Sequence, residues 1–186
     1  MKHKAVVAIV GMPGSGKTIA SRTLERLGLT RVRFGDITDE YLAQKGWEMT
    51  EKNERIIREG LRRKYGMAAY AALNIPRIER ALKEGSVVLD GLYSWEEYRV
   101  LKKHFPKNMT VIALYSSPET RYRRLSERKE RPLTVKEAQG RDRSEIENIG
   151  KAGPIAMADW TVVNEGKGIK ALEKEIESLW RKIRRS

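Results

Sequence analysis

The chain has 186 residues, no cysteine, two histidines, and 38 basic against 25 acidic residues, which gives a formal net charge of +13. This composition excludes disulfides and thiolate metal sites and argues against a histidine-based zinc site. The length predicts a single α/β domain over 1–186, and no apolar run approaches the roughly 18 residues of a membrane span. Because no signal-peptide pattern is present at the N-terminus, we expect a cytoplasmic protein with no membrane partner.

The first predicted element is a buried strand over 5–10, a continuous apolar run of the kind found in parallel sheets. The strand leads into a run that fits the phosphate-binding pattern G-x-x-x-x-G-K-[ST] without a mismatch. This run consists of Gly11, Met12, Pro13, Gly14, Ser15, Gly16, Lys17 and Thr18. A helix predicted over 19–27 follows, so strand, turn and helix occur in the order that a phosphate-binding loop requires.

The residue types of this loop predict ATP and Mg²⁺ as ligands. Its glycines let successive backbone N–H groups point inward at a helix N-terminus, which makes a nest for anions. Lys17 can reach the β- and γ-phosphates, and the Thr18 hydroxyl is the expected Mg²⁺ ligand, since Mg²⁺ keeps most of its waters. The alternative is a glycine-rich turn that has arisen by chance.

The rest of the chain alternates strands and helices. Further strands are predicted over 31–34, 87–90, 110–115 and 160–163. Helices are predicted from Asp36, over 50–82 with a break at Gly66 and a kink at Pro76, over 94–104, over 117–126, from Thr134, and over 168–185. This alternation predicts a parallel sheet covered by helices on both faces, with right-handed crossovers.

Two aspartates follow predicted strands, at the edge where open α/β sheets build their sites. Asp90 comes directly after a buried apolar run, and we expect its carboxylate to hold a Mg²⁺ water. We expect Asp36 to orient the hydroxyl of a phosphate acceptor or to take its proton. Either residue could instead cap a helix or a turn.

A group of arginines predicts a mobile lid over the phosphate site. The i, i+3, i+7 spacing places Arg121, Arg124 and Arg128 on one helical face. Arg131, Arg141 and Arg143 follow farther along the chain. Phosphoryl transfer needs positive charge that neutralises the transition state, and guanidinium groups on a lid supply it. The alternative is an exposed helix whose arginines pair with Glu119 and Glu127.

With these motifs the chain resembles the P-loop nucleoside and nucleotide kinases. Besides the phosphate loop, it has a Gly-Asp after the second strand, an Asp-Gly after the third, an Arg-x-x-x-Arg pair and an adenine-contacting loop. These motifs are Phe34-Gly35-Asp36, Leu89-Asp90-Gly91, Arg124 with Arg128, and Asn164-Glu165-Gly166. The chain is similar overall to an archaeal family of small P-loop proteins described as adenylate-kinase-like or dephospho-CoA-kinase-like.

The resemblance implies a three-layer α/β/α P-loop NTPase fold with a five-stranded parallel sheet of order 2-3-1-4-5. It also implies a helical acceptor-binding region over 37–82 and a short lid over 127–143. The implied catalytic residues are Lys17, Asp36, Arg128 and Arg141. The implied nucleotide-binding residues are the phosphate loop, Arg124, Asn164 and Gly166, and the implied metal-binding residues are Thr18 and Asp90.

The chain departs from adenylate kinases at two acceptor positions. That family has an arginine where this chain has Asp39, and a Pro-Arg pair where it has Tyr93-Ser94; both arginines hold the AMP phosphate. The departures argue against ordinary AMP phosphorylation unless Arg58, Arg62 or Arg77 supplies the missing charge.

Two functions from different classes fit these observations. The first is a phosphotransferase that moves the γ-phosphate of MgATP to a nucleoside, nucleotide or CoA-precursor acceptor, as a monomer or a homodimer. The second is a nucleotide-dependent RNA-binding or assembly factor with slow ATPase activity, for which the basic charge is suited. The second is disfavoured because no RNA-recognition motif is present and the tryptophans are scattered along the chain.

Overall fold

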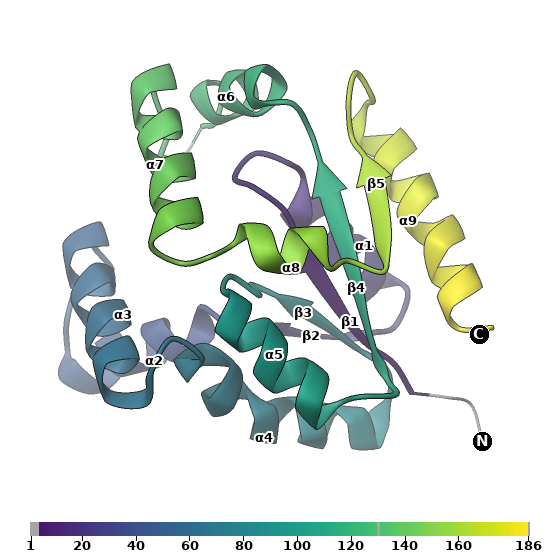
Figure 1. The fold of residues 1–186 in the computed structure, drawn as a ribbon, viewed down its shortest axis with the longest axis horizontal. Helices are drawn as coiled ribbons and strands as arrows, with labels where there is room; N and C mark the ends of the chain where they lie inside the picture. The colour runs from purple at the N-terminus through teal and green to yellow at the C-terminus, as the bar shows by residue number, and fades with distance from the viewer. Residues whose placement is uncertain (1–3, 130, 186) are drawn as a thin grey trace.

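The computed structural model describes residues 4–129 and 131–185, so residue 130 of the expected lid lies outside the described residues (Figure 1). Its centre is one five-stranded sheet in which every pair of neighbouring strands is parallel. The strands are β1 (Val6–Val10), β2 (Thr30–Arg33), β3 (Val87–Asp90), β4 (Met109–Tyr115) and β5 (Trp160–Val163). Their order is β2-β3-β1-β4-β5, which confirms the predicted 2-3-1-4-5 sheet.

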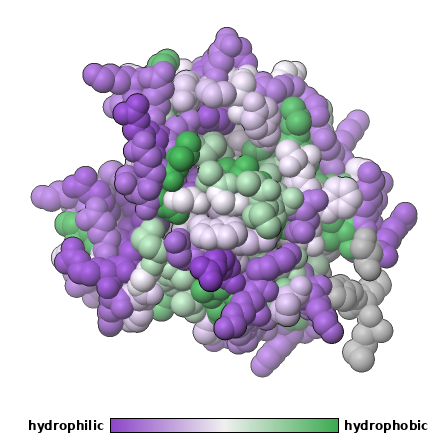
Figure 2. Space-filling model, viewed as in Figure 1, coloured by the Kyte–Doolittle hydropathy of each residue, from purple (hydrophilic) through white to green (hydrophobic). Residues whose placement is uncertain are grey.

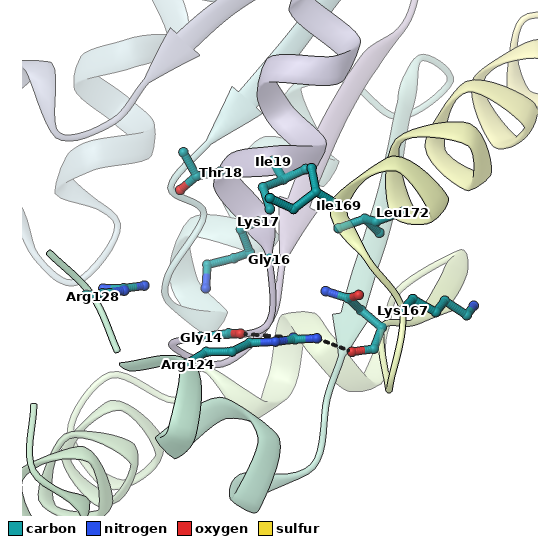
Figure 3. Close-up of a pocket in the computed structure, with 11 residues that line it drawn as sticks. Gly14, Gly16, Lys17, Thr18, Ile19, Arg124, Arg128, Lys167, Ile169 and Leu172 are labelled. Atoms are coloured by element: carbon teal, nitrogen blue, oxygen red, sulfur yellow. Dashed lines mark hydrogen bonds between the residues drawn. The ribbon is translucent and has the colours of Figure 1, made fainter. Parts of the chain in front are cut away.

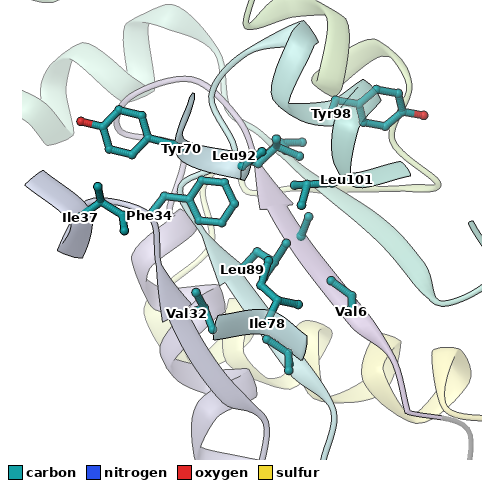
Figure 4. Close-up of a cluster of buried hydrophobic side chains, with 14 of the residues drawn as sticks. Val6, Val32, Phe34, Ile37, Tyr70, Ile78, Leu89, Leu92, Tyr98 and Leu101 are labelled. Atoms are coloured by element: carbon teal, nitrogen blue, oxygen red, sulfur yellow. The ribbon is translucent and has the colours of Figure 1, made fainter. Parts of the chain in front are cut away.

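The central strand β1 is buried along its whole length, because helices cover both faces of the sheet. Val6, Ala8 and Val10 belong to the core on one face, which α4 (Ala69–Glu84) and α5 (Trp95–His104) cover. Val7 and Ile9 face the other core, under α1 (Lys17–Arg26) and α9 (Ile169–Ile183). Figure 4 shows the first core, in which Val6 and Leu89 lie among side chains from the covering helices, including Ile78 and Leu101. The alternation along β1 therefore fixes which helices lie on which side.

The remaining helices lie beyond the carboxyl ends of the strands or beside them (Figure 1). These are α2 (Asp36–Lys45), α3 (Glu51–Tyr65), α6 (Pro118–Ser126), α7 (Val135–Glu147) and α8 (Ala152–Ala156). In the same view, Figure 2 shows hydrophilic side chains over α3 and α7 and a paler, more apolar centre over α8. Among the described residues, no helix is long and apolar enough to cross a bilayer.

Local sequence signals account for several helix ends. Ser94 and Thr134 each cap a helix in a complete capping box, with Glu97 and Glu137 as the reciprocal partners. Gly66, at φ 78°, separates α3 from α4 as predicted, since this backbone conformation is strained for other residues. Helix α4 then continues through Pro76 as one element.

Candidate active site

The loop between β1 and α1 has a backbone that only glycine adopts without strain. Gly11, Gly14 and Gly16 have φ values of 144°, 82° and 105°. A Cβ on Gly14 would lie 2.8 Å from the carbonyl oxygen of Arg121, and one on Gly16 would lie 2.7 Å from Nδ2 of Asn164. The loop is thus fitted against both residues, and it ends where α1 begins at Lys17.

Side chains from distant parts of the sequence hold the carbonyl oxygens of this loop. Arg121 donates to the Pro13 carbonyl at 3.1 Å, and the Asn164 Nδ2 donates to the Ser15 carbonyl at 2.9 Å. Arg124 lies 3.4 Å from the Gly14 carbonyl and also donates to the Asn164 carbonyl at 2.9 Å. Because its carbonyls are held from behind, the loop can present its N–H groups to a ligand.

Arg121 has a structural role, and the expectation that it reaches the γ-phosphate from a lid is wrong. Its side chain is buried and makes two hydrogen bonds to Asp142, at 2.9 and 2.6 Å. Tyr122 donates to the same carboxylate at 3.0 Å. This bidentate pair joins α6 to α7 and leaves Arg121 no free donor face for a phosphate.

Lys17 lies folded over the loop, with its Nζ 2.9 Å from the carbonyl oxygen of Met12. Burial is the main reason why the pKa of this lysine falls to about 7. The positive charges of Lys151 and Arg141 also lower the pKa, and the negative charges of Glu145 and Asp90 oppose them by a smaller amount. A phosphate would restore the charge of the ammonium group, because an anion favours the protonated form.

Arg128 and Arg141 are the predicted lid arginines that the structure brings together. Burial lowers the pKa of Arg128, and so does the charge of Arg141. Figure 3 shows the ends of Lys17 and Arg128 pointing toward one another across a pocket. Arg141 is half-exposed and donates through Nε to Glu145 at 3.1 Å. Arg143, by contrast, is largely exposed and lies 4.0 Å from Glu147 on the same helix.

Lys151 is a fourth cation at this point, and no motif in the sequence indicated it. Only 1% of the residue is exposed; its ammonium group binds the Glu145 carboxylate and lies 4.8 Å from the centre of the Tyr93 ring. Burial alone would raise the pKa of Glu145, but Lys151 and Arg141 bring it below its ordinary value. Arg141 and Lys151 thus bind the one carboxylate of Glu145, and Lys17 and Arg128 both lie close enough to Arg141 for its charge to lower their pKa values, so positive charge is in excess at the loop.

The two predicted aspartates lie in different surroundings. Asp90 accepts hydrogen bonds on Oδ2 from Ser21 at 3.1 Å and from Arg31 at 3.0 and 2.5 Å. Within the described residues these contacts all fall on Oδ2, so Oδ1 is available to a metal-bound water. Asp36 is in the first turn of α2 and forms an ion pair with Arg33 at 2.9 Å. It therefore lies in a charged cluster on the α2 side.

Thr18 and Asp90 fit a magnesium ion through the chemistry of their donors. Thr18 is exposed in the first turn of α1, beside the loop, and its hydroxyl is a hard oxygen ligand. The described residues contain no cluster of three acidic, histidine or cysteine side chains that would bind a metal alone. Mg²⁺ on a polyphosphate needs only one or two protein oxygens, so such a cluster is unnecessary.

A pocket of about 350 Å³ extends from the phosphate loop toward α9. Gly14, Lys17, Thr18, Arg124 and Arg128 line its polar end. Ile19, Ile169 and Leu172 make its apolar end, with Lys167 beside them (Figure 3), and Asn164 also lines the pocket. Gly166 forms the turn of the same β5–α9 loop, at φ 60°, and is not among the residues that line the pocket. The lining thus has a basic end suited to phosphates and an apolar end suited to a base, as a nucleotide site requires.

Comparisons with known proteins agree with this geometry. A family model described as an AAA domain matches residues 7–149. The UPF0200 protein of Thermococcus kodakarensis is 35% identical over 179 residues, which cover 94% of this chain and 95% of that protein. The UPF0200 protein of Sulfurisphaera tokodaii is also 35% identical, over 182 residues that cover 96% of this chain and 97% of that protein.

Solved structures of small-molecule kinases share the fold. A shikimate kinase from Acinetobacter baumannii in complex with shikimate has a TM-score of 0.59 at 18% identity, covering 97% of this chain and 95% of that chain. A gluconokinase from Sinorhizobium meliloti has a TM-score of 0.56 at 16% identity, covering 98% and 99%. At these identities the likeness shows the fold alone, a kinase-like P-loop fold.

Proposed function

Because this chain belongs to the UPF0200 family and carries an AAA domain with a kinase-like P-loop fold, we propose that it is an ATP-dependent small-molecule kinase. In the proposed reaction, an acceptor hydroxyl attacks the γ-phosphorus of ATP. A new P–O bond forms to the acceptor oxygen, the bond to the β-phosphate oxygen breaks, and ADP leaves. The partner that this reaction requires is a small molecule with a free hydroxyl, such as a nucleoside, nucleotide or CoA precursor.

The single observation that carries the proposal is the convergence of cations at the open end of the phosphate loop. These cations come from four parts of the fold. Lys17 begins α1, Arg128 follows α6, Arg141 lies in α7, and Lys151 directly precedes α8. A protein that binds a nucleotide and leaves its γ-phosphate intact needs charge only where the phosphates bind. A transferase must also stabilise the charge spread over the migrating phosphoryl group, between donor and acceptor.

The donor nucleotide occupies the loop and the pocket beside it. Backbone N–H groups of the loop and the Lys17 ammonium bind the β- and γ-phosphates, and the base lies against Ile169 and Leu172. Thr18 and, through a water, Asp90 would hold Mg²⁺, which supplies charge neutralisation on the phosphate oxygens when bound.

The acceptor lies on the side of helices α2 to α4, in the region 37–82. Asp36 orients the acceptor hydroxyl and takes up its proton as the new P–O bond forms, through Oδ2, since the ion pair with Arg33 involves Oδ1. The segment 127–143 acts as a lid, since it carries Arg128 and Arg141 over the transferred group. Closure would exclude water, which otherwise competes with the acceptor hydroxyl.

The test is a screen for phosphate transfer from ATP labelled in its γ-phosphate, with nucleosides, nucleoside monophosphates and dephospho-CoA as acceptors. A parallel titration measures RNA binding over a range of salt concentrations. The proposal predicts a labelled small-molecule product. Release of phosphate to water alone, together with salt-sensitive RNA binding, would overturn it in favour of an RNA-binding factor.

A further inference from the structure

Three arginines in the helical region are candidates to bind an acceptor anion, and the structure separates them. Arg58 is neutralised on its own helix by Glu51 at 2.6 Å and Glu54 at 3.2 Å. Arg77 is paired with Glu40. No carboxylate of the described residues pairs with Arg62, and its Nε is buried without a hydrogen-bond partner. Its guanidinium lies 5.8 Å from the centre of the Tyr70 ring.

A second side chain near Arg62 is also incompletely bonded. Glu97, in the first turn of α5, is fully buried, and its Oε2 accepts hydrogen bonds from the backbone N–H of Tyr93 at 2.8 Å and of Ser94 at 3.2 Å. Its Oε1 has no partner among the described residues. Burial raises the pKa of Glu97 to about 7, although the two backbone hydrogen bonds and the charges of Arg62 and Lys151 act to lower it.

Two opposite charges that are buried near one another ordinarily form a direct pair. Each unsatisfied buried donor or acceptor costs about 1–3 kcal/mol, and charged groups cost more. Arg62 lies over the Tyr70 ring near the start of α4, and Ser94, whose N–H binds Glu97, donates through its hydroxyl to the Met67 carbonyl just before α4 at 3.2 Å. Both side chains thus face the start of α4, yet the described residues show no salt bridge between them. A ligand placed between them would satisfy both, because it would accept from the guanidinium and donate to the carboxylate.

The position of this pair places it beside the transfer site. The backbone N–H of Tyr93 donates to Glu97 at 2.8 Å, and the Tyr93 ring lies 4.8 Å from the ammonium group of Lys151, which binds Glu145 of α7. Tyr93 follows β3, which pairs with β1, so this contact lies at the sheet edge where the phosphate loop begins. Tyr93 fills the same space: burial raises its pKa to about 12, and Asp90, Glu145 and Glu97 all contribute. A ligand bound at Arg62 and Glu97 would thus have its far end near the γ-phosphate.

We propose that Arg62 and Glu97 form the acceptor subsite, and that the acceptor carries both an anionic group and a hydroxyl or amino group. The anion, a phosphate or a carboxylate, binds Arg62, and the hydroxyl or amino group donates to Glu97. A separate hydroxyl receives the phosphoryl group. This inference rests on the proposed kinase function and narrows it, since a neutral nucleoside would leave Arg62 unpaired.

The test compares acceptors that differ only in the anion, with labelled ATP as donor. Suitable pairs are AMP with adenosine, CMP with cytidine, and shikimate with its methyl ester. In whichever pair is phosphorylated, the anionic compound should be the better acceptor. The phosphate and carboxylate pairs also show which anion the site takes. Preference for the neutral member would overturn the inference while the kinase function stands.

Variants of Arg62 then test whether this residue binds the anion of the acceptor. With the anionic acceptor, Arg62→Gln should raise KM about tenfold or more, whereas kcat and the KM for ATP should change much less. Arg62→Lys keeps the charge and should recover part of this loss. Arg63→Gln is the matched control, because Arg63 is the exposed neighbour on the same helix. Glu97→Gln should raise the same KM, and thermal melting shows whether each variant is folded.

The outcomes separate the two proposals. An acceptor KM of Arg62→Gln within twofold of the wild type would overturn the assignment of Arg62 while leaving the kinase function intact. ATP hydrolysis without transfer to any acceptor in the panel would overturn the kinase function, and this inference with it.

Discussion

The two halves of the candidate site differ in how completely their polar groups are bonded. The donor half comprises the phosphate loop 11–18, α6 and the β5–α9 loop, and its carbonyl oxygens are held by Arg121, Arg124 and Asn164. The acceptor half comprises α2, α3, the β3–α5 turn and Glu97, and it leaves atoms of two charged side chains, Arg62 and Glu97, without partners, whereas the unpartnered buried atom of the phosphate loop is the neutral hydroxyl of Ser15. Under the proposed function, the donor half is pre-organised for the nucleotide, and binding of the acceptor completes the other half. Experiments on each half test this difference.

The largest effect is expected from breaking the support behind the phosphate loop. Arg121→Met leaves the buried Asp142 carboxylate without its partner and should lower the free energy of unfolding by about 3–5 kcal/mol in a urea titration. Combining it with Asp142→Leu removes the stranded charge and should recover most of this loss. A single variant as stable as the wild type would show that the donor half does not depend on this pair.

Loss of the loop lysine should come next. Lys17→Ala removes the ammonium group that contacts the phosphates and should lower turnover about 10²- to 10³-fold, or about 3–4 kcal/mol of transition-state stabilisation. Circular dichroism should show an unchanged fold. Lys174→Ala is the control, because Lys174 is an exposed lysine of α9 that is not among the residues lining the pocket; its turnover should change less than threefold. Unchanged turnover in Lys17→Ala would remove the basis of the proposed function.

The incomplete bonding of the acceptor half should be visible as a pH effect on stability. Because the pKa of Glu97 rises from 4.5 to about 7 on folding, the folded state binds more protons than the unfolded state between these values. The stability that this group contributes is therefore full below about pH 4.5 and is lost as the pH rises through 7. Relative to Glu97→Gln, the wild type should lose about 3 kcal/mol across that window.

The matched control for this measurement is Glu96→Gln, since Glu96 is the exposed neighbour of Glu97. Its stability should follow the wild type at every pH. Parallel stability curves for the wild type and Glu97→Gln would contradict the assigned pKa shift. An anionic acceptor that donates a hydrogen bond to Glu97 should flatten the wild-type curve.

A smaller effect should accompany nucleotide binding in the donor half. The pKa of Lys17 is about 7 in the free protein, and the phosphates of ATP should raise it, so binding should take up protons. Calorimetry in buffers of different ionisation enthalpy should give an uptake of about half a proton at pH 7 and nearly one at pH 8. Binding at pH 8 without proton uptake would show that Lys17 is already charged in the free protein.

The smallest effect is expected where the two halves meet across the lid. Arg131, whose side chain is 68% exposed, approaches Glu54 of α3 at 3.4 Å. Exposed pairs of this kind contribute little, so Arg131→Ala should change the free energy of unfolding by less than about 0.5 kcal/mol. A loss above about 1 kcal/mol would show that this contact fastens the lid to α3 before any substrate binds.

The sheet and its motifs could be predicted because their signals are local. The apolar runs of β1, β3 and β4, the capping residues Ser94 and Thr134, and the break at Gly66 each depend on a few adjacent residues. The sheet order followed from the resemblance to P-loop kinases and is confirmed. The short helix α8 was not predicted, since its five residues have no periodic pattern.

The parts of the site that sequence reasoning missed depend on pairs formed in space. Arg121 fits a lid arginine by its spacing, and only its contact with Asp142, 21 residues later, makes it structural. Lys151 resembles a surface lysine until Glu145 and Tyr93 enclose it. Glu97 has the sequence of an ordinary capping box, but its second oxygen is buried and unpartnered. Burial and partner choice, rather than residue type, decide these roles.

Helices α2 and α3 form one continuous segment of the chain between the end of β2 at Arg33 and the turn at Gly66. The phosphate loop and the residues that support it all lie outside this segment. A chimaera that exchanges this segment between relatives needs two junctions, and it must keep the buried side chains Ile37, Leu42, Ile57 and Leu61, which pack in the core. Under the proposed function, such chimaeras would keep the ATP site of the recipient and would take part of their acceptor preference from the relative that supplied the segment. This segment is therefore a practical place to begin redesigning specificity.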